Sequence, residues 1–275
     1  MPFDGITRFC FAASYALTLG LELLQLVWPR PVQRLLATGF ACAGLLAHTL
    51  FLLMRRPPLA SQFGSLLLLS WILAVFYLYG SIHYRKLAWG VFVMPVVLGL
   101  VVLTSFVPAE RDPQSTFFPA LDSLRGESFW RFLHGLLLLL AAVGVCIGFM
   151  ASVMYLVQAR RLRAKVMPGQ GIRLLSLERL EEMNRRAINL AFPLLTGGVL
   201  AGAALMLDRA DQLHGWTDPK VLGGMALWLV FALVLYLRYG VHLRGRRLAQ
   251  LTIMAFVLML FTLAASHGMV QGVAP

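Results

Sequence analysis

The stretch Ala187–Tyr239 decides the fold: AINLAFPLLTGGVLAGAALML (187–207), DRADQLHGWTDPK (208–220) and VLGGMALWLVFALVLYLRY (221–239). The two outer segments are almost wholly apolar, and each has the roughly 20 residues that an α-helix needs to cross bilayer hydrocarbon. The stretch therefore predicts two membrane helices joined by a short polar loop. The loop places an imidazole, an indole, a carboxylate and an ammonium group at one membrane surface, on His214, Trp216, Asp218 and Lys220.

The composition of the whole chain extends this prediction. Of 275 residues, 59% are hydrophobic and only 13% are charged, and the mean hydropathy of +0.77 excludes a soluble globular domain. We expect an all-α bundle forming one integral membrane domain over residues 1–275. Eight apolar windows are long enough to be transmembrane helices: about 6–27, 35–54, 64–80, 87–106, 130–158, 187–207, 221–239 and 248–266.

A ninth helical pattern lies before the sixth window. In Ser176–Asn184 (SLERLEEMN), Leu177, Leu180 and Met183 share one side, and charged side chains occupy the other. This spacing is typical of an amphipathic helix, and we expect a cytoplasmic segment that lies along the membrane surface.

The basic residues predict the orientation. A net charge of +12 would suit nucleic acid in a soluble protein, but here the cations lie in short connections, where they act as topology anchors, so no nucleic-acid partner is expected. Sixteen of the 24 basic residues follow odd-numbered windows. The positive-inside rule then places both termini and the His214–Lys220 loop on the outer face of a bacterial inner membrane, with lipid as the surrounding partner.

The six histidines become a pattern once this orientation is applied. His83 and His242 fall beside cytoplasmic arginines and are interpreted as solvated side chains. The other four gather toward the outer leaflet: His48, His134, His214 and His267. Imidazole within a membrane needs a partner, and an axial pair from separate helices can hold a b-type haem. For His48, a hydrogen bond between helices is an equally good explanation.

Each of the loop residues has two interpretations. Trp216 is either an interfacial anchor or an aromatic floor for a porphyrin, and Lys220 is either a surface charge or a partner for a haem propionate. Asp218 either orients an imidazole or caps the helix that Pro219 begins, and capping is the simpler role. Because the chain has no CxxCH motif, any haem would be bound without covalent attachment.

Several segments resemble one known family. They are Trp216-Thr217-Asp218-Pro219-Lys220 with Trp228 downstream, Arg244 to Ala249, Leu177-Glu178-Arg179-Leu180, and Phe192 to Gly198. Together they resemble the cytochrome c assembly family of CcsA, ResC and CcmC-like proteins, and most closely its smaller eight-span HemX-type and YpjD-type members. That family handles haem with a tryptophan-rich loop on the outer face, flanked by membrane helices and histidines.

The resemblance implies a haem-handling membrane protein of cytochrome c assembly or haem supply, with non-covalent haem b as its cofactor. It favours His134 and His267 as axial ligands of the haem iron, with His48 as a further ligand or acceptor. Trp216, Asp218 and Lys220 would shape the loop above the haem. The family's loop is incomplete here, since Thr217 stands where a tryptophan is expected, so we predict binding without synthase activity.

Two other functions remain open. A HemX-like regulatory or scaffold protein of tetrapyrrole synthesis would dock a cytoplasmic partner on the basic segment Arg160–Arg186, without haem chemistry of its own. A small-solute transporter is the second, although the chain shows no internal repeat. If the family function applies, other cytochrome c maturation components are the expected protein partners.

Overall fold

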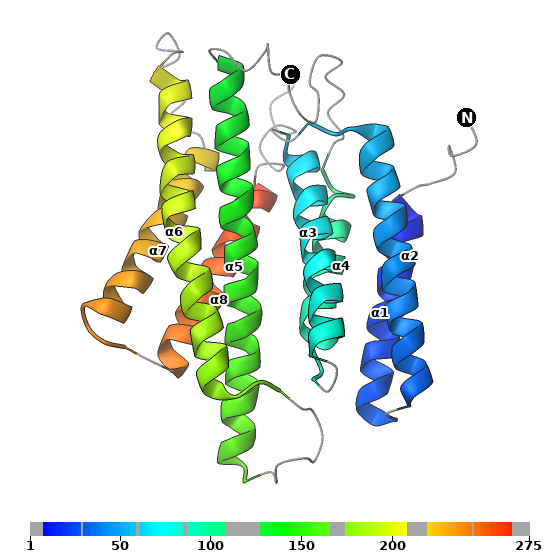
Figure 1. The fold of residues 1–275 in the computed structure, drawn as a ribbon. Coiled ribbons are helices and arrows are strands. Elements are labelled where there is room, and N and C mark those ends of the chain that lie inside the picture. The colour runs from blue at the N-terminus through cyan, green and yellow to red at the C-terminus, as the bar shows by residue number, and fades with distance from the viewer. Residues whose placement is uncertain are drawn as a thin grey trace, which may run out of the picture. The chain divides into compact units, whose positions relative to one another are not determined.

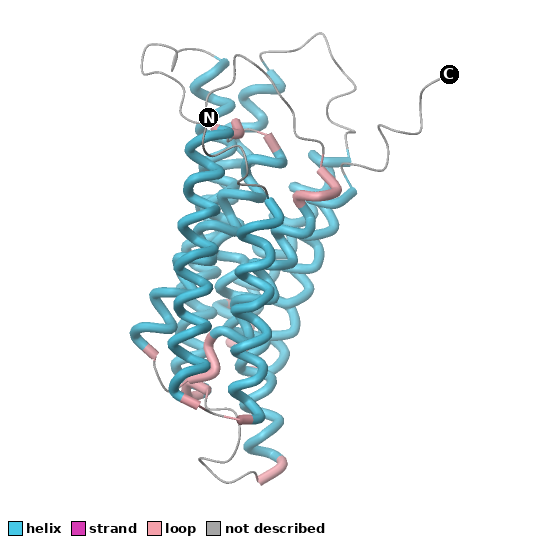
Figure 2. The backbone as a smooth tube through the Cα atoms, turned by 90° about the vertical axis from the view of Figure 1, so that its right-hand side faces the viewer, coloured by secondary structure: helices cyan, strands magenta, loops and turns pink. Residues whose placement is uncertain are grey.

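The computed structural model describes residues 8–28, 30–58, 61–84, 87–107, 127–165, 174–207, 219–243 and 245–265. It contains eight helices there and no strand, which confirms the all-α prediction (Figures 1 and 2). In chain order they are α1 (Arg8–Val27), α2 (Pro31–Arg55), α3 (Gln62–His83), α4 (Gly90–Leu103), α5 (Glu127–Arg163), α6 (Leu177–Leu207), α7 (Pro219–Tyr239) and α8 (Arg246–Ala265).

Seven of these helices are long and apolar enough to cross a membrane. The exception is α4, which has 14 residues where the sequence predicted a span over 87–106. At the start of α4, the side chain of Trp89 makes no capping hydrogen bond. At its end, the helix stops at Leu103, and non-helical turn residues begin at Thr104. At about 1.5 Å per residue, α4 is about 21 Å long, less than the hydrocarbon thickness.

The helices group into two compact units. Unit 1 is built on α1 to α4, and unit 2 is built on α5, through Ala159, with α6 to α8.

In unit 1, α1 packs antiparallel to α2 and α4, and polar side chains bond across the helices. Arg8 donates to the carbonyl oxygen of Thr104 at 2.9 Å, and the Tyr77 hydroxyl donates to Oε1 of Glu22 at 2.6 Å. Glu22, which would be costly in lipid, therefore faces other helices.

In unit 2, α6 differs from the prediction. The amphipathic segment Ser176–Asn184 is not a separate surface helix, because α6 runs without a break from Leu177 to Leu207. Its charged face is exposed, and Glu182 pairs with Arg185 at 2.5 Å and with Arg186 at 2.6 Å. Its apolar side is buried, since Leu180 has no exposed surface. Because this side of α6 packs against the other helices of unit 2, the segment continues into the membrane helix and does not form a separate surface helix.

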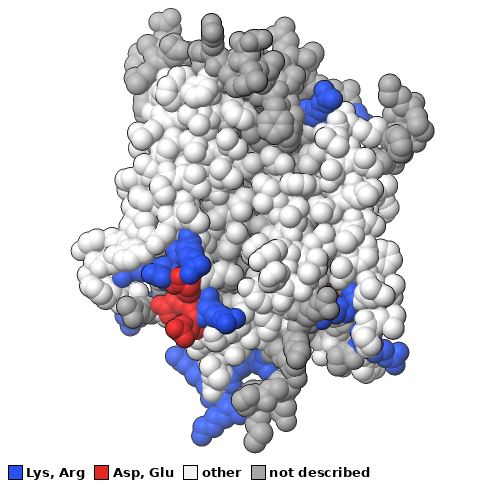
Figure 3. All heavy atoms as spheres, viewed as in Figure 1, with Lys and Arg blue, Asp and Glu red and all other residues white. Residues whose placement is uncertain are grey.

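Charged and apolar surfaces are separated as a membrane requires. On the face in Figure 3, the described Lys, Arg, Asp and Glu side chains gather toward the helix ends, and the band between them carries none. Large apolar side chains are exposed within the helices, including Leu190, Leu200, Leu229 and Phe261, each at least 60% exposed. A lipid environment removes the cost of exposing them.

Candidate functional site

His134 lies in the second turn of α5, and its ring is held by α6. Nδ1 is 2.7 Å from the carbonyl oxygen of Gly198. A carbonyl oxygen only accepts, so Nδ1 carries the proton and donates, and the Nε2 lone pair stays free. Metal-binding histidines are commonly oriented in this way, with the second ring nitrogen donating to a backbone carbonyl. The ring is half-buried, so Nε2 is not sealed into the core.

The imidazole fits against α6 because Gly202 has no side chain. A β-carbon at position 202 would lie 2.9 Å from Cε1 and 3.0 Å from Nδ1 of His134. We call the space left by the missing side chain of Gly202 the notch. The notch determines where the His134 ring can lie, and the Gly198 carbonyl determines which ring nitrogen faces outward.

The close approach continues along α5 and α6, which run antiparallel. A β-carbon at Gly198 would lie 2.6 Å from Leu138, and one at Gly144 would lie 2.8 Å from the β-carbon of Ala191. Small residues four apart, such as Gly144 and Gly148 on α5, let membrane helices approach backbone to backbone. We call this contact, from His134 to Asn184, the α5–α6 seam.

A buried amide closes the other end of the seam. The Asn184 Nδ2 group donates to the carbonyl oxygen of Gly148 at 3.1 Å, to Ser152 Oγ at 2.7 Å and to Thr252 Oγ1 at 3.3 Å. Its Oδ1 accepts from Arg238 Nη1 at 3.2 Å. The Asn184 side chain therefore joins α5, α6, α7 and α8 and fixes how far each helix is shifted along its axis relative to the others.

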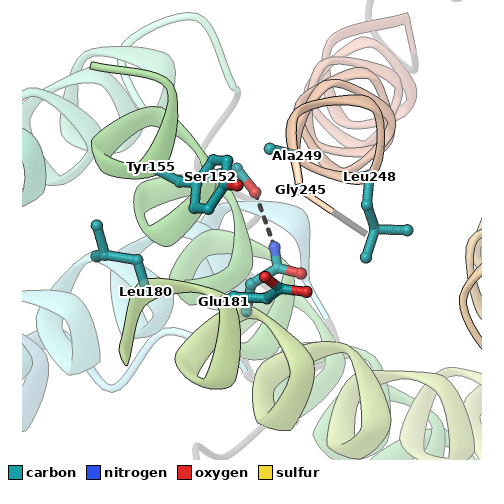
Figure 4. Close-up of a pocket in the computed structure, with 8 residues that line it drawn as sticks. Ser152, Tyr155, Leu180, Glu181, Gly245, Leu248 and Ala249 are labelled. Atoms are coloured by element: carbon teal, nitrogen blue, oxygen red, sulfur yellow. Dashed lines mark hydrogen bonds between the residues drawn. The ribbon is translucent and has the colours of Figure 1, made fainter. Parts of the chain in front are cut away.

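Arg238 is a buried cation held by neutral acceptors. It is only 7% exposed, and its second donor group, Nη2, bonds to the backbone oxygen of Glu181 at 3.3 Å. Among the described residues it forms no ion pair with a carboxylate. A small cavity of about 10 Å³, enough for one water molecule, lies beside this network (Figure 4). Its lining residues are Ser152, Tyr155, Leu180, Glu181, Asn184, Gly245, Leu248 and Ala249.

The directions of the helices in unit 2 place four helix ends together. α8 is antiparallel to α5, since Phe256 stacks on Phe149 with ring centroids 3.9 Å apart and Gly245 lies by Tyr155. α7 is antiparallel to α6, since Trp228 donates to Thr196 and the later Arg238 donates to the earlier Asn184. The starts of α5 and α7 and the ends of α6 and α8 therefore lie at the same end of the unit, with His134.

The other predicted residues of this site are only partly described. Trp216, Asp218, His214 and His267 lie outside the described residues. Lys220 is in the first turn of α7, but its side chain is outside the description. Their roles therefore stay predictions, but the segments that carry them are attached to the end of unit 2 that holds His134.

His48 lies in unit 1 and is fully buried in an aromatic cluster. Its ring stacks on Phe11 with centroids 4.2 Å apart and an interplanar angle of 2°. Nδ1 is 3.3 Å from the Tyr15 hydroxyl, and Nε2 has no hydrogen-bond partner. The hydrogen bond between helices that the sequence allowed is therefore present, and the ring is enclosed by Phe11 and Tyr15.

Sequence reasoning missed two features of this region. It placed Asn184 at the end of a surface segment, but the side chain is 5% exposed and joins four helices. It also missed the glycines under His134, although their spacing of four in Gly198 and Gly202 was a readable signal. No group of three or more His, Cys, Asp or Glu residues in the described part of the chain could hold a bare metal ion.

The comparisons with known proteins agree on one family. The profile of the cytochrome C assembly protein family matches residues 59–273. Among similar proteins are three named cytochrome c biogenesis protein CcsA. That of Gloeobacter violaceus is 25% identical over 88% of this chain and 86% of its own. That of Parasynechococcus marenigrum is 26% identical, over 94% and 91%, and that of Guillardia theta 27%, over 73% and 70%. No solved structure matches this chain.

Proposed function

Because the chain belongs to the cytochrome c assembly protein family, we propose that it binds and handles non-covalent haem b in the membrane during cytochrome c assembly. The observation that carries this proposal is His134, whose Nδ1 donates to Gly198 and whose Nε2 lone pair is free. A neutral imidazole fixed in this tautomer fits haem iron.

The remaining parts of the site follow from the chain path. His267 would supply a second imidazole for the haem iron, because it follows α8 by two residues at the end of unit 2 where α5 begins. Trp216 and Asp218 would lie in the loop at this end, and Lys220 would offer an ammonium group to a haem propionate. Bound haem would supply an iron centre that accepts imidazole nitrogens, and these residues would hold and orient it.

His134 has the most direct role. The bond to Gly198 orients the ring and directs Nε2, the nitrogen that would bind the iron, away from that carbonyl. His48 is a weaker candidate, because its ring is enclosed by Phe11 and Tyr15. We propose binding and presentation of haem, not bond-making chemistry, as this chain's activity. We also propose that the site lies at the outer face of a bacterial inner membrane, with other maturation components as partners.

An optical spectrum tests the proposal. The full chain is purified in mild detergent from haem-replete cells, and its Soret band and haem content are compared with those of His134→Ala and His267→Ala. We expect a Soret band in the wild type and its loss in both variants. The matched control is His83→Ala, because His83 is exposed in unit 1 and stacks on Tyr79. A colourless wild type, or equal haem in His134→Ala and His83→Ala, contradicts the proposal.

A regulatory scaffold is the alternative. It would use exposed cations in the last turn of α5 and near the start of α6, such as Arg160, Arg163 and Arg185. In that case, replacing these arginines abolishes cellular function and His134→Ala leaves it intact. Haem-dependent function gives the reverse result, so one complementation experiment separates the two.

A further inference from the structure

The first turns of α8 border an open groove outside the proposed haem site. It lies at the end of unit 2 where α8 begins, and the start of α5 lies at the opposite end. The groove is shallow and open to the outside, with a volume of about 600 Å³, and it is lined by Leu243, Arg247, Gln250, Leu251, Ile253 and Met254.

The groove has one cation above an aliphatic wall. Arg247 and Gln250 are exposed, and neither has a hydrogen bond or ion pair within the described part of the chain. Below them, Met254 is 64% exposed. Val257 and Phe261 continue this uncovered apolar surface along α8.

Among the described cations at this end of unit 2, Arg247 both lacks an anionic partner and lines the groove. Arg185 and Arg186 pair with Glu182, and Arg238 is buried against Asn184. Arg246, its neighbour, is also exposed but does not line the groove. A cation without an anion, placed where an apolar helix begins, matches the position of lipid phosphates at the membrane surface.

We propose that this groove binds one anionic phospholipid. The phosphate would pair with the Arg247 guanidinium, the Gln250 amide would donate to a headgroup oxygen, and an acyl chain would cover Leu251 and Met254. A free phosphate ion would leave the aliphatic wall uncovered. A soluble protein partner would have to displace lipid from Met254 and Phe261.

The test measures lipid binding to the full chain in a neutral detergent. Phosphatidylglycerol and phosphatidylcholine with the same acyl chains are titrated, and binding is followed by native mass spectrometry and by the rise in melting temperature. We expect phosphatidylglycerol to bind more tightly. Arg247→Gln should weaken its binding about fivefold, the factor expected for one cation at an anionic surface.

Three controls make the result specific. Arg246→Gln removes the same charge one residue away and should leave binding within about twofold of wild type, because Arg246 does not line the groove. Arg247→Lys keeps the charge and should retain most of the binding. Met254→Trp fills the groove while leaving Arg247 in place, and should weaken the binding of both lipids.

Two results overturn the proposal. If Arg246→Gln and Arg247→Gln weaken binding equally, the attraction is diffuse electrostatics and there is no site. If inorganic phosphate at the same concentration protects the protein as well as phosphatidylglycerol does, the aliphatic wall has no part in recognition. Neither result bears on haem, because His134 is unchanged in every variant.

Discussion

The substitution Gly202→Ala tests whether the notch in α6 positions His134, the proposed haem ligand. The new methyl group would lie 2.9 Å from Cε1 of His134, whereas carbon atoms in contact are about 3.5–4.0 Å apart. The ring must therefore move by about 0.5–1 Å. Because Nδ1 is the next nearest atom, at 3.0 Å, this movement disturbs the 2.7 Å hydrogen bond to Gly198.

The expected energies follow from these contacts. Overpacking a tight helix contact costs about 1–3 kcal/mol, and losing one hydrogen bond costs about 1 kcal/mol. Alanine has a higher helix propensity than glycine, which stabilises α6 by about 1 kcal/mol. We therefore expect a net loss of about 1–3 kcal/mol in the free energy of unfolding. If His134 binds haem iron as proposed, its hydrogen-bond partner is disturbed and haem affinity should fall about 10–100-fold.

The assay is a haem titration of the detergent-purified protein, followed at the Soret band, together with thermal unfolding. Gly224→Ala is the matched control, because Gly224 lies within α7 and a β-carbon there would meet no atom of another helix within 4 Å. The control should bind haem normally and gain up to about 1 kcal/mol. The reasoning is refuted if Gly202→Ala binds haem with wild-type affinity and an unchanged Soret maximum.

Three further predictions concern buried polar groups, each measured as unfolding free energy in detergent. Asn184→Leu removes one hydrogen bond from each of Arg238, Gly148, Ser152 and Thr252 and should cost about 3 kcal/mol or more; a loss below about 0.5 kcal/mol would show that the amide is not needed. His48→Phe keeps an aromatic ring against Phe11 and loses one long hydrogen bond, so we expect a change below about 1 kcal/mol. Tyr77→Phe removes the donor to Glu22 and should cost about 1–3 kcal/mol, and an unchanged melting temperature would contradict the bond at 2.6 Å.

Hydropathy was sufficient for most of the fold. The predicted window 221–239 became α7, Pro219–Tyr239, and the window 248–266 became α8, Arg246–Ala265. Burial of apolar surface in lipid depends on composition over about 20 residues, and a single sequence records that composition directly. The family was also recognisable, because the Trp216-to-Lys220 motif and the segments around it are local in sequence.

Two elements differ from the segments predicted by local patterns. The window 87–106 has the hydropathy of a span, but the helix formed is only Gly90–Leu103. The pattern of Ser176–Asn184 fits a surface helix, but it is the start of α6, because Leu180 and Asn184 are buried in unit 2. Hydrophobic periodicity says which face is apolar, and it does not say what covers that face.

The sequence by itself determined a polytopic helical membrane protein of the cytochrome c assembly family and singled out His134. Only the tertiary structure decided which ring nitrogen of His134 is free, because that depends on a carbonyl 64 residues away, on α6. It likewise decided that Asn184 joins four helices and that His48 is enclosed by aromatic rings. Hydropathy is a property of a segment, but the hydrogen bonding and access of an imidazole depend on backbone and side-chain groups that only packing brings together.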